Sequence, residues 1–226
     1  MRVGLVCPYS FNEPGGVQAH VLDLAAKLRE LGHHSQVLGP ASDRTELPDY
    51  VTRGGPAVPV RYNGSVARLS FGPQVRWTTR HFIEEGNFDV LHVHEPNSPS
   101  YSMVATRMAT GPIVATYHAS AESSYALKLA LPALRGSLEK IRAGIAVSDQ
   151  AWRWQAEQVG TDPVIIPNGV DTRRFAKARS DHGSGGAEIV FLGRHDEPRK
   201  GLDVLLQAVE LLPRRPRVTV VGGGGP

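Results

Sequence analysis

The fold is set by residues 3–38, VGLVCPYSFNEPGGVQAHVLDLAAKLRELGHHSQVL. The first run, 3–7, is apolar without polar alternation, which predicts a strand buried on both faces. Apolar residues then recur at three- and four-residue spacing from Val17 to Leu28, which predicts a helix that Gly32 closes. The run 35–38 predicts a second strand. Strand, helix and strand in such a short stretch form a βαβ unit, which implies a parallel sheet.

The same alternation continues through the next part of the chain and predicts a doubly wound α/β fold. Asp149 is expected to cap the helix that carries Trp152 and Trp154. The further strands are expected at 89–94, 112–117, 144–148 and 163–167, with helices at 100–108, within 127–142 and after 149.

A polar, glycine-rich stretch at 176–187 predicts a linker between a first domain, 1–175, and a second, 188–226. The second part contains a strand, a helix and a strand, which form a single βαβ unit. Because one such unit leaves two open sheet edges and a bare face, it cannot bury a core by itself. We therefore expect 188–226 to be the start of an incomplete second domain.

Composition narrows the class of protein. With 226 residues, 41% hydrophobic and 21% charged, the chain has the composition of a globular protein, and no apolar run approaches the roughly 20 residues of a membrane span. The single cysteine, Cys7, cannot form an internal disulfide, which fits a reducing cytoplasm. A balance of 25 basic to 22 acidic residues is too even to indicate nucleic acid as a partner.

Two short motifs are typical of anion binding. Pro14-Gly15-Gly16-Val17 lies where the first helix begins, so free N–H groups could meet a phosphate there; a simple tight turn is the alternative. Arg194 and Lys200 lie after a strand and before a helix. Cations near the start of a helix interact unfavourably with its dipole, so a bound anion would explain their presence there. A solvated run of charges is the alternative for this pair.

Three histidines and one helix are the remaining candidates for a functional role. His92 and His94 share a strand face, but no third ligand follows at helical spacing, so we expect a structural or hydrogen-bonding role and no metal. His118 ends a strand at the carboxyl edge, where a substrate contact and an ordinary edge residue are both compatible with the pattern. Segment 72–85 could settle on an anionic membrane, although spacing alone favours an ordinary amphipathic helix; its candidate contacts are Arg76, Trp77, Arg80 and His81.

Taken together, the motifs resemble those of the GT-B glycosyltransferases of family four, over nearly the whole chain. A smaller set is similar to the actinobacterial members that mannosylate phosphatidylinositol. The general motifs are Pro14-Gly15-Gly16-Val17, His92-Val93-His94-Glu95-Pro96, Ala146-Val147-Ser148, 166–171, Gly193-Arg194 and Arg199-Lys200-Gly201, and the more specific ones are 7–11, 62–69 and Arg153-Trp154-Gln155.

The resemblance implies two Rossmann-like domains and transfer of mannose, with retention, from GDP-mannose to the 2-position of the inositol ring of phosphatidylinositol. It implies a peripheral protein on the anionic inner leaflet of the plasma membrane. No cofactor is expected to be tightly bound, and a Mg²⁺ ion accompanying the donor diphosphate is left open. By the same resemblance His118 lies near the reacting sugar, the donor contacts are Gly16, Arg194 and Lys200, and the acceptor contacts are Tyr9, Asn63, Arg68 and Asn97.

Three departures from the family pattern leave alternatives open. The acidic pair that holds the donor belongs beyond Pro226, Glu13 replaces an aspartate, and Ser123 replaces a lysine for which Lys128 could compensate. The alternatives are a family-four transferase that uses a UDP-sugar and a soluble acceptor, and a non-catalytic module that binds membranes or lipid headgroups.

Overall fold

The computed structural model describes residues 1–62, 65–118, 125–176, 188–195 and 197–223. The chain divides into two compact units, 1–60 with 67–169 and 61–66 with 170–226, so the division falls after Gly169 rather than after residue 175. Most of the expected linker, together with Asn63 and Ser123, lies outside the described residues.

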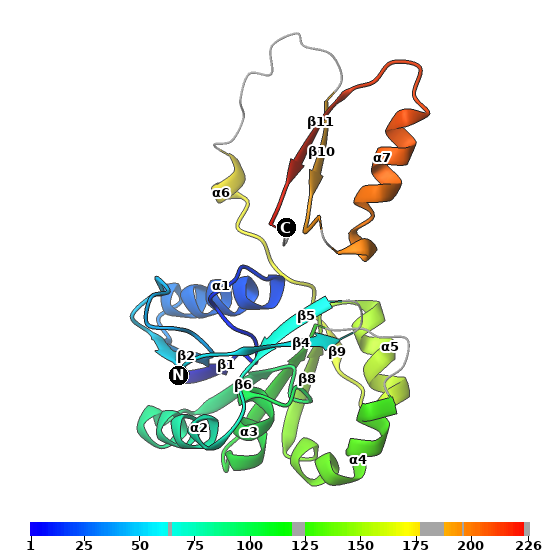
Figure 1. Ribbon diagram of the computed structural model, residues 1–226. Coiled ribbons are helices and arrows are strands. Elements are labelled where there is room, and N and C mark those ends of the chain that lie inside the picture. The colour runs from blue at the N-terminus through cyan, green and yellow to red at the C-terminus, as the bar shows by residue number, and fades with distance from the viewer. Residues whose placement is uncertain (63–64, 119–124, 177–187, 196, 224–226) are drawn as a thin grey trace. The chain divides into compact units, whose positions relative to one another are not determined.

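The larger unit contains a seven-stranded sheet in the order β3-β2-β1-β6-β7-β8-β9 (Figure 1). Every neighbouring pair in this sheet is parallel, which confirms the expected α/β architecture. The strands are β1 (Arg2–Val6), β2 (His34–Gly39), β3 (Val51–Arg53), β6 (Val90–His94), β7 (Ile113–Tyr117), β8 (Ile141–Ala146) and β9 (Val164–Ile165).

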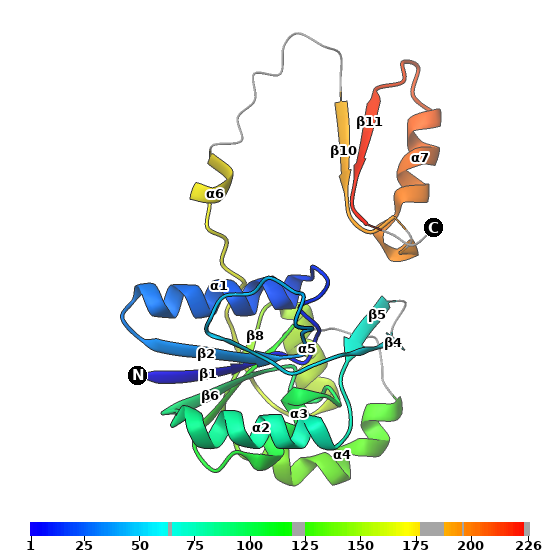
Figure 2. The ribbon, with the colours of Figure 1, turned by 60° about the vertical axis from the view of Figure 1, so that its left-hand side comes forward.

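The helices of this unit cover both faces of the sheet. Figure 2 shows α1 on one side of the strands and α2 and α3 on the other. The end of α1 is as predicted, because Gly32 takes a left-handed φ of 84° and the N–H of His33 donates to the carbonyl of Leu28. The helices are α1 (Gly16–Glu30), α2 (Pro73–Gly86), α3 (Tyr101–Met108), α4 (Tyr125–Leu138) and α5 (Asp149–Gln158).

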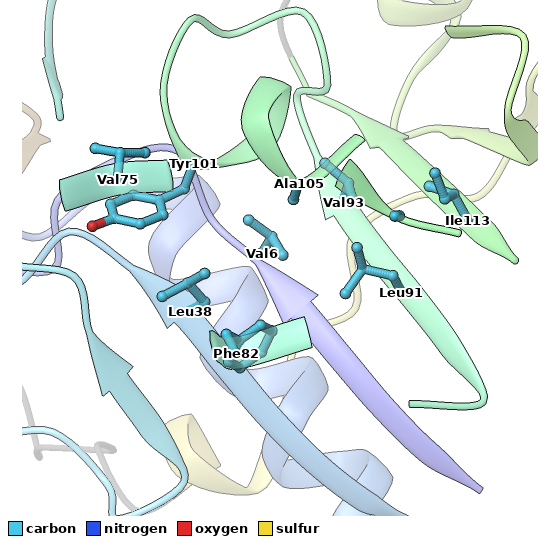
Figure 3. Packing of buried hydrophobic residues seen from close by; sticks show 10 residues of the cluster. Val6, Leu38, Val75, Phe82, Leu91, Val93, Tyr101, Ala105 and Ile113 are labelled. Carbon is cyan, nitrogen blue, oxygen red and sulfur yellow. The ribbon is translucent and has the colours of Figure 1, made fainter. Parts of the chain in front are cut away.

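The two larger hydrophobic clusters of the core lie one on each face of the sheet, and a third, smaller one contains Leu134 and Trp154. The α1 face packs Leu5 and Val37 of the strands against Val21 and Ala25 of the helix. On the other face, α2 and α3 cover the cluster drawn in Figure 3, where the hydroxyl of buried Tyr101 also donates to the carbonyl of Gly54 at 2.5 Å. The labelled members of that cluster are Val6, Leu38, Val75, Phe82, Leu91, Val93, Tyr101, Ala105 and Ile113.

The structure corrects two local predictions and adds three strands. The N-cap of α5 is Ser148, whose hydroxyl accepts the N–H of Ala151 at 3.2 Å, and Asp149 is the first helical residue. Strand β8 begins at Ile141 rather than at 144, because it pairs with β7 from Ile113 onward. Strands β3, β4 (Val58–Tyr62) and β5 (Ser65–Leu69) were not predicted.

The smaller unit contains the predicted βαβ unit. Strands β10 (Glu188–Leu192) and β11 (Arg217–Val221) pair in parallel, and between them lie a 3₁₀ turn, η1 (Pro198–Lys200), and helix α7 (Leu202–Glu210). A short helix, α6 (Arg173–Ala176), precedes them. Among the described side chains of this unit, Val209 and Glu197 are the buried ones.

None of the helices in the described ranges is both long enough and apolar enough to cross a membrane.

Candidate functional site

The candidate site lies where the direction of strand addition reverses. Strand β1 has β2 on one side and β6 on the other, so the topological switch point is between β1 and β6. In open α/β sheets, ligands bind beyond the carboxyl ends of the strands at such a point. The segments that follow β1, β6 and β7 carry Tyr9, Asn97 and His118, which the sequence predicted as site residues.

The loop after β1 is fixed by hydrogen bonds to its surroundings. The N–H of Cys7 donates to the carbonyl of Leu38, and the side-chain amide of Gln18 donates to the carbonyl of Ser10. Gly15 precedes the first turn of α1, which has no side-chain cap and no acidic residue. A Cβ added at exposed Gly16 would meet no atom within 4 Å, so the start of α1 is open at this position.

Histidines from α1, β6 and the segment after β7 gather near this edge of the sheet. Nδ1 of His94 lies 3.0 Å from Nε2 of His118, and the ring of His20 meets the ring of His118 edge-on at 5.1 Å between centroids. His92 stacks on His94 at 4.5 Å and its Nε2 is 2.7 Å from the hydroxyl of Thr116. His92, His94 and His118 were candidates from the sequence, whereas His20 was not.

These imidazoles are neutral near pH 7. Burial, together with the other histidines, lowers the pKa of His118 to about 3 and that of His92 to about 4. The pKa of fully buried His94 is also well below its ordinary value for the same reasons. Burial lowers the pKa of His20, and the nearby Asp23 carboxylate partly opposes that effect. Each ring therefore has one N–H donor and one acceptor nitrogen.

Glu95 joins the loops that follow β6 and β7. Its carboxylate accepts the backbone N–H of His118 at 2.5 Å, and its own N–H donates to the carbonyl of Thr116 at 2.9 Å. The residue is buried and has a φ of 51°, which non-glycine residues seldom adopt. Sequence reasoning missed this role, because nothing local marks a backbone acceptor.

The predicted acceptor residues differ in their partners. Arg68 forms an ion pair with Glu13, and its carbonyl accepts the N–H of Ser10 at 3.1 Å, so β5 is tied to the loop after β1. Both polar atoms of the Asn97 side chain are buried and have no hydrogen-bond partner among the described residues. Half-buried Tyr9 packs against the cluster on the α1 face. Asn63 lies outside the described residues.

The two predicted donor cations lie in the smaller unit. Arg194 follows β10, and Lys200 ends η1, one residue before Gly201 and the start of α7. Both residues are exposed, and the N–H of Lys200 donates to the carbonyl of Glu197 at 2.9 Å. The structure therefore puts both cations in one strand-to-helix connection, whereas Gly16 belongs to the other unit.

The predicted membrane residues share the outer face of α2. Val75, Thr79 and Phe82 point into the protein, whereas Arg76 and Arg80 are exposed. Trp77, whose exposed fraction is 63%, has its ring centroid 3.9 Å from that of His81. The structure thus brings Arg76, Trp77, Arg80 and His81 onto one side of a single helix.

Comparisons with known proteins are consistent with this architecture. A model of the family "Glycosyltransferase Family 4" matches residues 14–174. Two solved structures share the fold. Sucrose-phosphate synthase from Thermosynechococcus elongatus has a TM-score of 0.68 and 17% identity, and the match covers 99% of this chain and 63% of that chain. Anabaena HepE in complex with UDP has a TM-score of 0.67 and 16% identity, and the match covers 100% of this chain and 62% of that chain. This likeness confirms the expected GT-B fold over the part that this chain covers.

Three curated relatives carry the name phosphatidyl-myo-inositol mannosyltransferase. The protein of Mycolicibacterium smegmatis is 55% identical over 99% of this chain and 59% of its own length, and that of Mycobacterium tuberculosis is 53% identical over 99% and 61%. The protein of Propionibacterium freudenreichii is 40% identical over 94% and 58%. The chain thus spans about three fifths of the length of these relatives. Because the family model matches well over half of its residues, the chain belongs to glycosyltransferase family 4.

Proposed function

We propose that the protein containing this chain transfers mannose from GDP-mannose to the 2-position of the inositol ring of phosphatidylinositol, with retention at the anomeric carbon. The observation that carries this proposal is the 53–55% identity, over 99% of this chain, to relatives named phosphatidyl-myo-inositol mannosyltransferase. It agrees with the position of the candidate residues at the switch point of a parallel sheet.

The acceptor contacts in this proposal are Tyr9, Asn63, Arg68 and Asn97. The Asn97 amide supports the assignment, because it offers a buried donor and a buried acceptor that no described part of the chain satisfies. An inositol hydroxyl both donates and accepts hydrogen bonds, so it can satisfy either atom. Arg68 supplies a cation for the lipid phosphate, and Glu13 holds it beside the loop that carries Tyr9.

The donor contacts are Gly16, Arg194 and Lys200. As the bond from the anomeric carbon to the diphosphate breaks, negative charge grows on the leaving GDP, and cations and helix N–H groups stabilise it. The open start of α1 and the two cations after β10 suit that task. Mg²⁺ prefers oxygen ligands, whereas the described cluster of potential metal ligands is made of histidine nitrogens, so the diphosphate oxygens would have to hold such an ion.

The proposed chemistry needs no covalent intermediate. The inositol 2-hydroxyl oxygen bonds to the anomeric carbon on the face that the phosphate leaves, and its proton passes to an oxygen of that phosphate. His118 contacts the transferring sugar in this proposal. Because burial lowers the pKa of His118 to about 3, it acts as a neutral hydrogen-bonding group rather than as a cationic acid.

The outer face of α2 is proposed to contact the anionic cytoplasmic face of the plasma membrane. Arg76 and Arg80 provide charge toward acidic lipids, and Trp77 provides a large exposed ring with a polar N–H, suited to the headgroup region. Exposed Phe71, just before the helix, adds a second aromatic ring.

A labelling assay on the protein translated from the complete reading frame tests the proposal. GDP-[¹⁴C]mannose and vesicles containing phosphatidylinositol are expected to give a labelled lipid. Transfer from a UDP-sugar to soluble inositol phosphate, with no labelled lipid, would replace the proposal with the second transferase function. Binding to vesicles without turnover on any donor would point to a non-catalytic module.

Two substitutions test the donor assignment. Arg194→Ala and Lys200→Ala are each expected to lower kcat/KM for GDP-mannose by about 10- to 150-fold, because each removes a charge-assisted contact of about 1.5–3 kcal/mol. Arg214→Ala removes an exposed cation between α7 and β11 and is the matched control. Equal losses in all three variants would contradict the assignment.

A further inference from the structure

We propose that His20, His94 and His118 bind a divalent transition-metal ion of the Zn²⁺ class, with a fourth position open to water. This inference goes beyond the proposed function and does not depend on it. From the sequence no metal is expected, because no third ligand follows His92 and His94 at helical spacing. The fold supplies two further histidines from other elements.

The positions of the three rings match a shared ion. One ligand atom from each residue lies within 4.8 Å of the others. The ring centroids are 5.1 Å apart for His20 and His118, 5.3 Å for His94 and His118, and 5.6 Å for His20 and His94. With Zn–N bonds of about 2.1 Å and tetrahedral angles, the centroids of two bound imidazoles are about 5.3 Å apart. The separations of the ring centroids are therefore close to those of imidazoles that share one tetrahedral ion.

The nitrogens are chemically ready to coordinate. Nδ1 of His94 lies 3.0 Å from Nε2 of His118, and two nitrogens on a tetrahedral Zn²⁺ are about 3.4 Å apart, so a small opening admits an ion in place of the shared proton. The imidazoles are neutral, as metal ligands must be.

The elements that carry the ligands are firmly placed. His94 ends β6, in the middle of the sheet, and its carbonyl accepts the hydroxyl of Ser102 at 2.6 Å. Glu95 fixes the backbone of His118. His20 and His118 are half-buried, which gives an ion a route from solvent, whereas His94 is fully buried. Rigid elements with one accessible side are what a preorganised metal site needs.

The ligand set selects the kind of metal. Three imidazole nitrogens suit Zn²⁺, Co²⁺, Ni²⁺ and Cu²⁺, whereas Mg²⁺ prefers oxygen. Because the proposed function puts His118 at the transferring sugar, an ion here would compete with that contact.

Metal titration of the tag-free, chelator-washed chain tests the proposal without nucleotide or lipid. Calorimetry is expected to show one Zn²⁺ per chain with a Kd of about 1 µM or below. Co²⁺ is expected to give the intense visible absorption of a tetrahedral site, which Zn²⁺ abolishes, and Mg²⁺ is expected to produce no heat. No Zn²⁺ binding, or a Co²⁺ spectrum of the octahedral hexaaqua type, would overturn the proposal.

Substitutions identify the ligands. His20→Ala and His118→Ala are each expected to weaken Zn²⁺ binding at least tenfold, with circular dichroism verifying the fold of each variant. His33→Ala, beyond the opposite end of α1, is the matched control and should bind as tightly as the unaltered chain. Unchanged affinity in folded His20→Ala, or an equal loss in His33→Ala, would overturn the assignment. Because all these readouts are binding readouts, a failed transferase assay would not affect them.

Discussion

Glu95 is the residue that ties the loops after β6 and β7 together. Its carboxylate accepts the part-buried N–H of His118, while its own backbone is in the left-handed region. Glu95→Ala is expected to lower the free energy of unfolding by about 1–3 kcal/mol, because the His118 N–H loses its acceptor. Glu95→Gln keeps an oxygen acceptor and should lose less. Urea denaturation of both variants measures the difference.

The control for this prediction is Glu84→Ala, which truncates an exposed glutamate on α2. If Glu95→Ala were as stable as this control, the carboxylate would not be holding the His118 segment.

Cys7 lies just after β1, fully buried beside the switch point. Burial raises the pKa of its thiol to about 12, so at pH 8 the thiolate fraction is on the order of 10⁻⁴. Since thiol reagents attack the thiolate, native protein should resist labelling, and urea-unfolded protein should react within minutes. Mass spectrometry after iodoacetamide treatment gives the labelled fraction. Rapid labelling of native protein would mean that β1 opens readily at this end.

At the scale of one element, α2 illustrates how helical periodicity separates two roles. Val75, Thr79 and Phe82 share the buried side, and Arg76 and Arg80 share the exposed side. The double substitution Arg76→Gln/Arg80→Gln is expected to weaken binding to phosphatidylserine-containing vesicles about 30-fold, at about 1 kcal/mol per cation. Flotation or calorimetry at fixed ionic strength measures this affinity.

Lys27→Gln/Arg44→Gln is the matched control for charge, because it removes two exposed cations from α1 and the loop after β2. Both double variants should keep the stability of the unaltered chain. An equal loss of binding in both would mean that net charge, rather than the α2 face, attracts the membrane.

At the scale of the whole molecule, the two units differ in how much they bury. The larger unit holds a seven-stranded sheet with a cluster on each face, whereas the described side chains of the smaller unit include two buried residues, Val209 and Glu197. Backbone amides of β10 and α7 should therefore exchange with solvent at least 10³-fold faster than those of β1 and β6. Hydrogen exchange with mass spectrometry measures both. Equal exchange rates in the two units would contradict the expectation that the smaller unit is less stable than the larger one.

Much of the fold could be predicted from local pattern. The unbroken apolar run of β1, the three- and four-residue spacing along α1 and the position of Gly32 each depend on neighbours in sequence, and each was confirmed. Strand β3 was missed because its three residues are too few to show a period. Capping was misassigned by one residue at α5, where Ser148 and Asp149 are both good caps.

The candidate site was only partly predictable. His118 could be placed from the pattern, because carboxyl ends of parallel strands meet at one edge, whereas Tyr9 and Asn97 came from the resemblance to the family. His20 carried a usable signal, since it falls in the apolar stripe of α1, three residues after Val17 and one before Val21. Glu95 carried none, because its partner is a backbone N–H 23 residues away.

The amino-acid sequence alone therefore determined the βαβ units, the parallel sheet and the family, because hydrophobic period and short motifs are properties of nearby residues. Tertiary structure alone decided that His20, His94 and His118 meet, that their imidazoles are neutral, and that Glu95 holds the last of them. Those features depend on strand order and on exclusion of water, and both arise only when segments far apart along the chain pack together.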